Sequence, residues 1–323
     1  MRKSSPVIKK LEKPVLTYKD IPYNAALIFN AGVAKVDGKY VMLFRNDYGD
    51  YENQILKGTN LGVARSDDGI HWVADPEPAL AMKDDEVLRI YDPRLTVIDG
   101  KMHICFAQDT VHGLRGGIAT TDDFKSMTIH SLSAPDNRNM VLFPEKINGM
   151  YVRLERPMPI YSRNRDKDTF DIWCSRSPDL RYWGDTELVL GVEHVPFAND
   201  KIGPAAPPVK TDRGWLTTFH AVEIDESRGK HGWEDKWTKM YYAGIMLLDL
   251  NDPSKVIGYS KEPLITPELP HETDVGFRTD VIFPGGMILE DNGEVKIYYG
   301  AADTVECLAT ADVNDLIDLC LNS

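Results

Sequence analysis

The sequence predicts an all-β fold, a five-bladed β-propeller with a short C-terminal helix. Three observations support this prediction. A strand–turn–strand pattern recurs five times, each copy is followed by a second hairpin-like segment, and long helical patterns are absent before the last dozen residues. Two hairpins make one four-stranded sheet, and repeats of about 50 to 80 residues are typical of propeller blades.

The five first hairpins are identified by their turns. Asp-Gly or Asn-Gly pairs between alternating apolar residues are the strongest short hairpin signal, and they occur at 37–38, 99–100 and 148–149. The five copies span residues 29–45, 90–106, 141–156, 207–220 and 281–299.

The second hairpins complete the predicted units. They span residues 61–72, 117–124, 172–183, 243–253 and 306–312, and the last leads into an amphipathic helix. We therefore expect one catalytic domain over residues 1–323, with an extended lead-in at 1–25 and a terminal helix at 311–323.

Composition limits the classes of function. The chain has 323 residues and a formal net charge of −13, which argues against nucleic acid or an anionic membrane as a partner. Its four cysteines have no C-x-x-C spacing, and its basic start lacks the apolar core of a signal peptide. No histidine has metal-ligand spacing. We expect a cytoplasmic protein without a metal or other cofactor.

A propeller brings the ends of its inner strands together around one channel, so polar residues at those ends become candidates for a site. Asp92 precedes the second inner strand, and Arg94 would share its face if the segment were extended. The candidates expected to converge are Asn30, Arg45, Asp47, Asp92, Arg156, Lys201, His220 and Asp303.

Basic residues cluster near the third and fourth copies in spite of the acidic composition. Arg156 and His220 close successive hairpins, while Arg138 and Lys201 lie just upstream of them. Three cations and a histidine suit an oxyanion such as phosphate, because arginine gives forked contacts and lysine a point charge.

Ten short segments, given at the end of this paragraph, resemble glycoside hydrolase family 130, the inverting β-mannoside phosphorylases. The resemblance extends from about Asn24 to Leu321. Its pieces are 29–32 (FNAG), 91–94 (YDPR), 137–139 (NRN), 142–149 (LFPEKING), 156–157, 201–203 (KIG), 214–216 (GWL), 220, 247–253 (LLDLNDP) and 298–304 (YYGAADT).

The resemblance implies a role for each matching residue. Asp92 would be the general acid, with its proton passing through a hydroxyl of the mannosyl unit. Phosphate would be the co-substrate and a β-mannoside the substrate. The implied phosphate-binding residues are Arg138, Asn139, Arg156, Lys201, His220 and Tyr299, and the implied sugar-binding residues are Asn30, Arg45, Tyr91 and Asp303.

Phosphorolysis also follows from the charges. An inverting hydrolase needs a second carboxylate to activate water, whereas phosphate is already a nucleophilic anion held by cations. We expect phosphorolysis of a β-mannoside, first of a β-1,4-linked mannosyl sugar or mannooligosaccharide, to α-D-mannose 1-phosphate, by a homo-oligomer.

Three alternatives stay open. The enzyme could act on β-1,2-linked mannobiose or oligomannan. A propeller hydrolase, a β-mannosidase or an arabinanase-like enzyme, would use Glu145, Glu155 or Glu223 as its second carboxylate, and a non-catalytic propeller would only bind carbohydrate. Residues 158–165 and Ala221 depart from the family pattern, which leaves the linkage and the acceptor sugar open.

Overall fold

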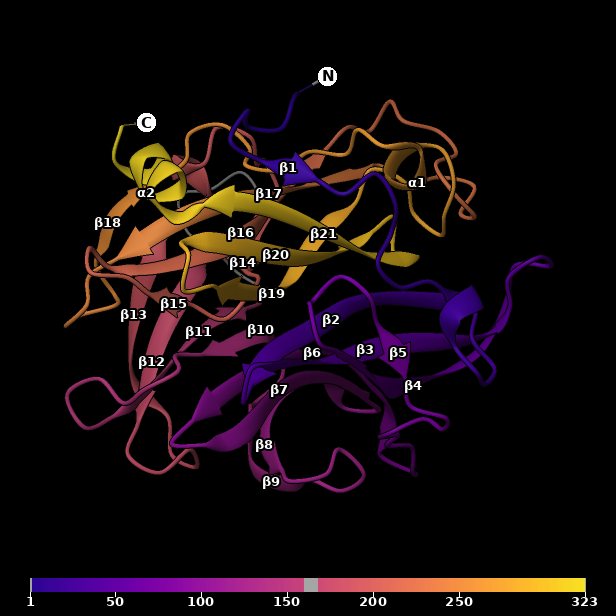
Figure 1. The fold of residues 1–323 in the computed structure, drawn as a ribbon, viewed down its shortest axis with the longest axis horizontal. Coiled ribbons are helices and arrows are strands. Elements are labelled where there is room, and N and C mark those ends of the chain that lie inside the picture. Colours follow the sequence, from indigo (N-terminus) through magenta and orange to yellow (C-terminus); the bar gives the residue numbers. More distant parts are fainter. Residues whose placement is uncertain (1, 160–167, 323) are drawn as a thin grey trace.

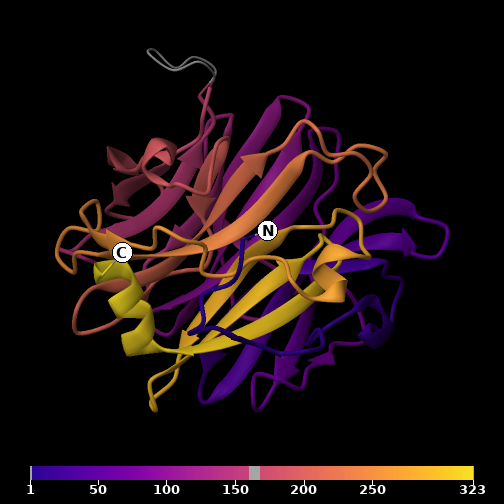
Figure 2. The same cartoon turned by 90° about the horizontal axis from the view of Figure 1, so that it is seen from above.

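The computed structural model describes residues 2–159 and 168–322 and confirms the five-bladed propeller. Five small antiparallel sheets surround a common axis (Figures 1 and 2). The first three blades are continuous in sequence. Their strands are β2 (Leu27–Val36), β3 (Lys39–Asp50), β4 (Ile55–Ser66) and β5 (Val73–Ala74); β6 (Val87–Ile98), β7 (Lys101–Thr110), β8 (Gly113–Thr121) and β9 (Thr128–Leu132); and β10 (Asn137–Leu142), β11 (Tyr151–Pro157), β12 (Ile172–Ser177) and β13 (Gly184–Leu190).

The fourth and fifth blades differ from this pattern. Blade four divides its inner edge between two short strands, and blade five takes its outer strand from the chain's beginning. Their strands are β14 (Lys201–Pro204), β15 (Val209–Lys210), β16 (Trp215–Ile224), β17 (Lys239–Leu248) and β18 (Val256–Tyr259), then β19 (Ile282–Leu289), β20 (Glu294–Ala301), β21 (Val305–Asp312) and β1 (Lys9–Lys10). The helical segments are η1 (Tyr18–Asp20), η2 (Val192–His194), α1 (Pro270–Thr273) and α2 (Val313–Leu321).

The predicted lead-in is therefore part of a blade. β1 pairs antiparallel with β21 and closes the ring of sheets. The ammonium of Lys10 lies 2.7 Å from a carboxylate oxygen of Glu272, whose other oxygen accepts a 2.9 Å hydrogen bond from Tyr299. These contacts join the chain's beginning to α1 and β20, which sequence patterning along the first 25 residues did not indicate.

The terminal helix is shorter than expected. It begins after Asp312, whose side chain accepts a hydrogen bond from the main-chain N–H of Asn314 and so caps α2. Its apolar face packs on blades four and five through Leu316, Ile317 and Cys320.

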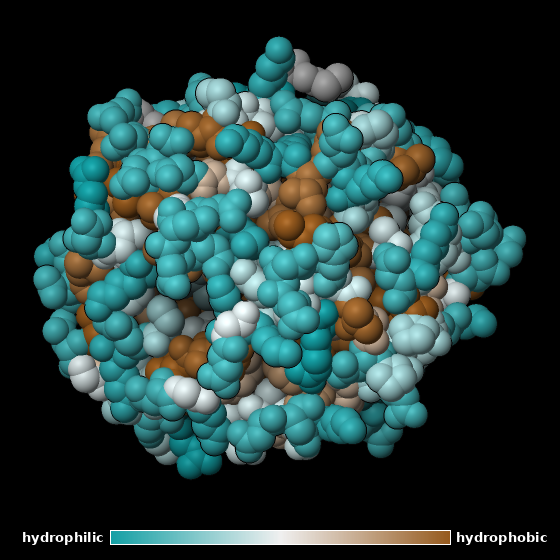
Figure 3. Space-filling model, in the orientation of Figure 1, coloured by the Kyte–Doolittle hydropathy of each residue, from teal (hydrophilic) through white to brown (hydrophobic). Residues whose placement is uncertain are grey.

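Hydrophobic residues lie mainly between neighbouring blades. Side chains alternate along each strand, so each sheet contributes to two interfaces. On β3, Val41 and Leu43 pack toward blade two, whereas Met42 and Phe44 pack toward blade five. One buried cluster fills each of the five interfaces. On the face seen in Figure 3, hydrophobic residues are scattered among hydrophilic ones.

Candidate functional site

A β-bulge at the same strand position directs a polar side chain into the channel in each of three successive blades. The innermost strands β2, β6 and β10 each carry a bulge, where their register with the next strand shifts. At these bulges Asn30, Asp92 and Asn139 have φ values of 53°, 52° and 57°. Asparagine and aspartate tolerate this left-handed region better than other non-glycine residues. The bulges therefore bring the three side chains, far apart in sequence, to one pocket.

Asp92 is held by one of its two oxygens. Asn30 donates a 3.0 Å hydrogen bond to Oδ1 of Asp92, and Arg45 Nη1 lies 3.3 Å from the same oxygen. Arg45 also forms two hydrogen bonds with Asp47, of 3.0 and 2.7 Å. Burial disfavours the charge of Arg45, but the two aspartates raise its pKa above the ordinary value. These contacts leave Oδ2 of Asp92 without a hydrogen bond to the described residues.

The expected pairing of Asp92 with Arg94 is wrong. The bulge breaks the alternation on which it depended, and Arg94 turns into the protein interior with 2% exposure. Its guanidinium donates to the main-chain carbonyls of Pro93 and Ala205, at 2.8 and 2.6 Å, and to those of Asn30 and Pro284, at 3.4 and 3.3 Å. Arg94 thus joins its own blade to blades one, four and five.

Asp303 and Glu234, with Arg278 between them, form what we call the acidic wall beside Asp92. Asp303 follows β20 of blade five, and Arg278 Nη1 lies 3.5 Å from its carboxylate. Burial raises the pKa of Asp303 to about 6, although Arg278 and Arg45 act in the opposite direction. Glu234 holds Arg278 through two hydrogen bonds of 3.0 and 2.7 Å.

A cationic wall comes from blades three and four. Arg138 and Arg156 are register partners on β10 and β11, while Lys201 begins β14 and His220 lies on β16. Burial and then Arg138 lower the pKa of Arg156 to about 9. Burial and then Arg156, Lys239 and Arg138 lower that of Lys201 to about 6. Asp200, whose carboxylate lies 3.9 Å from Lys201 Nζ, compensates only part of this buried basic group. The remaining positive charge is unfavourable until an anion binds.

The contact between Arg156 and His220 fixes the tautomer of the histidine. Arg156 Nη1 lies 2.9 Å from Nε2 of His220, and a guanidinium can only donate. The imidazole is therefore neutral with its proton on Nδ1, consistent with burial and then Arg156 lowering the pKa of His220 well below its usual value. Gly203 permits this packing, because a Cβ at that position would lie 2.4 Å from the imidazole ring.

Several buried polar atoms of this wall have no hydrogen-bond partner among the described residues. Buried polar groups in native proteins are nearly always paired, so such a cluster indicates a ligand. The unpaired donors are Nε of Arg138, Nε of Arg156 and Nδ1 of His220, and the unpaired acceptors are Oδ1 of Asn139 and Oδ2 of Asp200, which lies beside Lys201.

These two walls enclose a cavity of about 140 Å³. It brings together most of the predicted residues: Asn30, Arg45, Tyr91, Asp92, Arg138, Asn139, Arg156 and Asp303 line it. Asp47 stands behind Arg45, and two members of the cationic wall, Lys201 and His220, lie outside the cavity lining, next to Tyr241 and Arg156. The lining also includes Arg89, Trp237, Tyr241, Arg278, Val281 and Phe283, which the sequence reasoning missed.

Tyr299 is not at this cavity. Its side chain is fully buried in the cluster between blades four and five, and its hydroxyl donates to Glu272. The tyrosine at the cationic wall is Tyr241, whose ring stacks on His220 with centroids 6.3 Å apart. Tyr241 therefore takes the place that Tyr299 had in the prediction.

The carboxylates proposed for a hydrolase lie elsewhere. Glu145 pairs with Lys210 at 2.6 Å, and Glu155 pairs with Arg153 at 2.7 Å. Glu223 accepts a 3.2 Å hydrogen bond from Tyr242. None of the three lines the cavity around Asp92.

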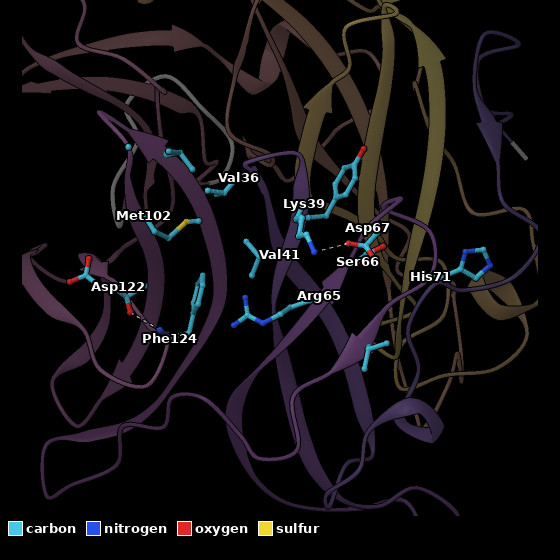
Figure 4. Close-up of a pocket in the computed structure, with 15 residues that line it drawn as sticks. Val36, Lys39, Val41, Arg65, Ser66, Asp67, His71, Met102, Asp122 and Phe124 are labelled. Carbon is cyan, nitrogen blue, oxygen red and sulfur yellow. Dashed lines mark hydrogen bonds and ion pairs between the residues drawn. The ribbon is translucent and has the colours of Figure 1, made fainter.

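A larger cavity of about 590 Å³ lies between blades one and two, at the strand ends opposite Asp92. Figure 4 shows its apolar lining, with Val41, Met102 and Phe124, and the ion pair of Lys39 with Asp67, 3.3 Å apart. None of the predicted site residues lines it.

Residues 2–159 and 168–322 contain no group of three or more His, Cys, Asp or Glu side chains arranged to hold a metal ion. Within the same ranges, neither α1 nor α2 is long and apolar enough to cross a membrane.

Comparisons with known proteins agree with this arrangement. The family model described as beta-1,4-mannooligosaccharide phosphorylase, glycoside hydrolase family 130, matches residues 2–322. A beta-1,2-mannobiose phosphorylase of Listeria innocua is 35% identical over 75% of this chain, and the match spans 63% of that relative, less than two thirds of its length. A beta-1,4-mannooligosaccharide phosphorylase of Ruminococcus albus is 31% identical, covering 94% of this chain and 88% of the relative. The solved complex of a Listeria innocua beta-1,2-mannobiose phosphorylase with beta-1,2-mannobiose superposes with a TM-score of 0.83 and 27% identity, over 98% of this chain and 99% of that one.

Proposed function

This chain belongs to glycoside hydrolase family 130, and we propose that it cleaves a β-mannoside by inverting phosphorolysis. The products are α-D-mannose 1-phosphate and the released acceptor sugar. One observation carries the proposal. The cationic wall of Arg138, Arg156, Lys201 and His220 is buried and has hydrogen-bond donors without partners, and it lies beside Asp92, a carboxylate that is hydrogen-bonded through only one of its oxygens.

The cationic wall and Asp92 supply the two requirements of the reaction, a bound nucleophile and a proton donor. Phosphate bound to the cationic wall attacks the anomeric carbon, forming a new C–O bond from the face opposite the leaving group. The glycosidic C–O bond breaks, and Asp92 supplies the proton that the leaving oxygen takes up, by way of a mannosyl hydroxyl. Asn30 and Arg45 bind Oδ1 and fix the orientation of the carboxyl group, so Oδ2 is the oxygen available for proton transfer.

The linkage distinguishes two candidate substrate classes. We propose β-1,4-linked mannooligosaccharides as the first substrate class, in agreement with the description of the family model. β-1,2-Linked mannobiose or oligomannan is the second candidate, favoured by the relative with 35% identity and by the superposed complex.

The test is the dependence of sugar release on phosphate. β-1,4- and β-1,2-linked mannobiose are incubated with the enzyme at increasing phosphate concentration, and both mannose 1-phosphate and free mannose are quantified. We expect mannose 1-phosphate from one linkage, at a rate that falls to background without phosphate. Free mannose released equally fast in phosphate-free buffer would show a hydrolase instead.

Phosphate binding is also expected to take up a proton. The pKa of Lys201 is about 6 in the empty site, so this amine is neutral at about pH 8. A bound dianion raises the pKa, and Lys201 gains about one proton per phosphate. Calorimetry in two buffers of different ionisation enthalpy at about pH 8, where phosphate itself is mostly dianionic, measures this uptake.

The variant Lys201→Met serves as the control for that measurement. Methionine is an unbranched side chain only one heavy atom shorter than lysine but cannot bind a proton, so the uptake should disappear. The same uptake in both proteins would show that another group receives the proton.

A further inference from the structure

The pocket has a defined mouth. The side chains of Arg89 and Arg278, two charged residues of the lining, are 41% and 33% exposed. Those of Arg45 and Asp92 are only 12% exposed. A cavity of about 140 Å³ is too small to enclose an oligosaccharide. The rest of a longer substrate must therefore lie outside the cavity, and these two more exposed arginines mark where the lining reaches solvent.

A row of aromatic rings begins at Arg278. The guanidinium of Arg278 lies 4.8 Å from the ring centre of Phe277, which contacts Trp233 edge-on at 5.7 Å. Trp233 contacts Tyr51 at 5.4 Å, and Tyr51 stacks on Tyr18 at 4.6 Å. All four rings are partly exposed. We call Phe277, Trp233, Tyr51 and Tyr18 the aromatic row.

The row is assembled from four separate parts of the chain. Phe277 precedes blade five, Trp233 lies in the loop between β16 and β17, Tyr51 follows β3, and Tyr18 begins η1. Acidic groups accompany it: Glu234 holds Arg278, and Glu52 accepts a 3.3 Å hydrogen bond from Tyr18. Partly exposed rings with carboxylates beside them suit sugars, whose C–H faces pack on aromatic rings while their hydroxyls need acceptors.

We propose that the aromatic row binds the mannosyl units of an oligosaccharide that extend beyond the pocket. This inference rests on the proposed function, because the pocket must hold the end that is cleaved. It assigns to these four rings the recognition of mannosyl units beyond a disaccharide, which the pocket alone does not provide. In a purely structural role, Tyr51, Trp233 and Phe277 would only cover the buried cluster of Ala26, Leu27 and Phe29 against which they pack.

The experiment compares a short and a long substrate. Phosphorolysis of mannobiose and mannotetraose, in both β-1,4 and β-1,2 linkage, is measured for wild type, Tyr51→Ala and Tyr18→Ala. We expect kcat/KM for mannotetraose to fall about tenfold through a higher KM, with mannobiose changed less than about twofold. Tyr51→Phe should retain the wild-type values. Tyr182→Ala, which removes an exposed tyrosine of blade three, should match wild type.

The outcomes separate the two hypotheses. Equal falls for both substrates, or no change for either, would overturn the aromatic row while phosphorolysis stands. If Tyr51→Ala does not fold, Tyr18→Ala decides the same question. If wild type cleaves no β-mannoside, the proposed function fails, and quenching of tryptophan fluorescence by mannotetraose still tests the row. Equal quenching in wild type and Tyr18→Ala would then overturn it.

Discussion

Replacing Asp92 with asparagine is expected to reduce phosphorolysis by about a thousandfold without loss of the fold. The amide keeps the hydrogen-bonding shape of the carboxyl group but cannot deliver a proton to the leaving oxygen. The backbone tolerates the change, because asparagine readily adopts the left-handed φ of 52° at this bulge. The rate of mannose 1-phosphate formation at saturating phosphate measures the effect.

The reverse reaction gives an independent check. Synthesis from mannose 1-phosphate and an acceptor sugar passes through the same transition state, so it should be reduced by the same factor. Asp99→Asn is the matched control, since it makes the same chemical change in the exposed turn at the other end of this hairpin, where φ is 50°. If Asp92→Asn retained activity within a few-fold of wild type, another group would have to be the acid.

Replacing Arg156 with glutamine is expected to lower kcat/KM for phosphate about a hundredfold. The substitution removes a charged donor from the buried wall and leaves Arg138 and Lys201 to hold the anion. Without phosphate, we expect the free energy of unfolding to increase. Arg156 has a pKa lowered to about 9 by burial and then by Arg138, so its charge is unfavourable in the empty protein.

Two measurements together identify this role. Initial rates at varied phosphate concentration give the loss of kcat/KM, and thermal unfolding with and without phosphate gives the change in stability. Arg181→Gln, an exposed arginine of blade three, controls for loss of positive charge in general. An unchanged KM for phosphate in Arg156→Gln would contradict the assignment of the cationic wall.

The turns at Asp37-Gly38, Asp99-Gly100 and Asn148-Gly149 could be predicted because they depend on local backbone preference. Their φ values are positive at both residues, which is the conformation that these dipeptides favour. Alternating apolar residues between such turns determine strands and blades in the same local way, so the propeller and the convergence of strand ends followed from the sequence.

The residues of the site followed only in part. Asn30, Asp92 and Asn139 share equivalent strand positions, and the resemblance identified them before the bulges were known. Tyr299 and Tyr241 could not be distinguished in this way, because both lie in apolar strands and only the packing of the blades determines which faces the pocket.

Local sequence by itself therefore determined the hairpins, their number and most of the polar residues at their ends, because these depend on neighbours a few residues apart. Tertiary structure alone decided the contacts made across the ring. It paired Lys9 and Lys10 with β21, turned Arg94 away from Asp92, and brought Trp237 and Arg278 to the pocket. The physical reason is that these positions depend on how separate sheets pack, and no periodicity along one strand records that packing.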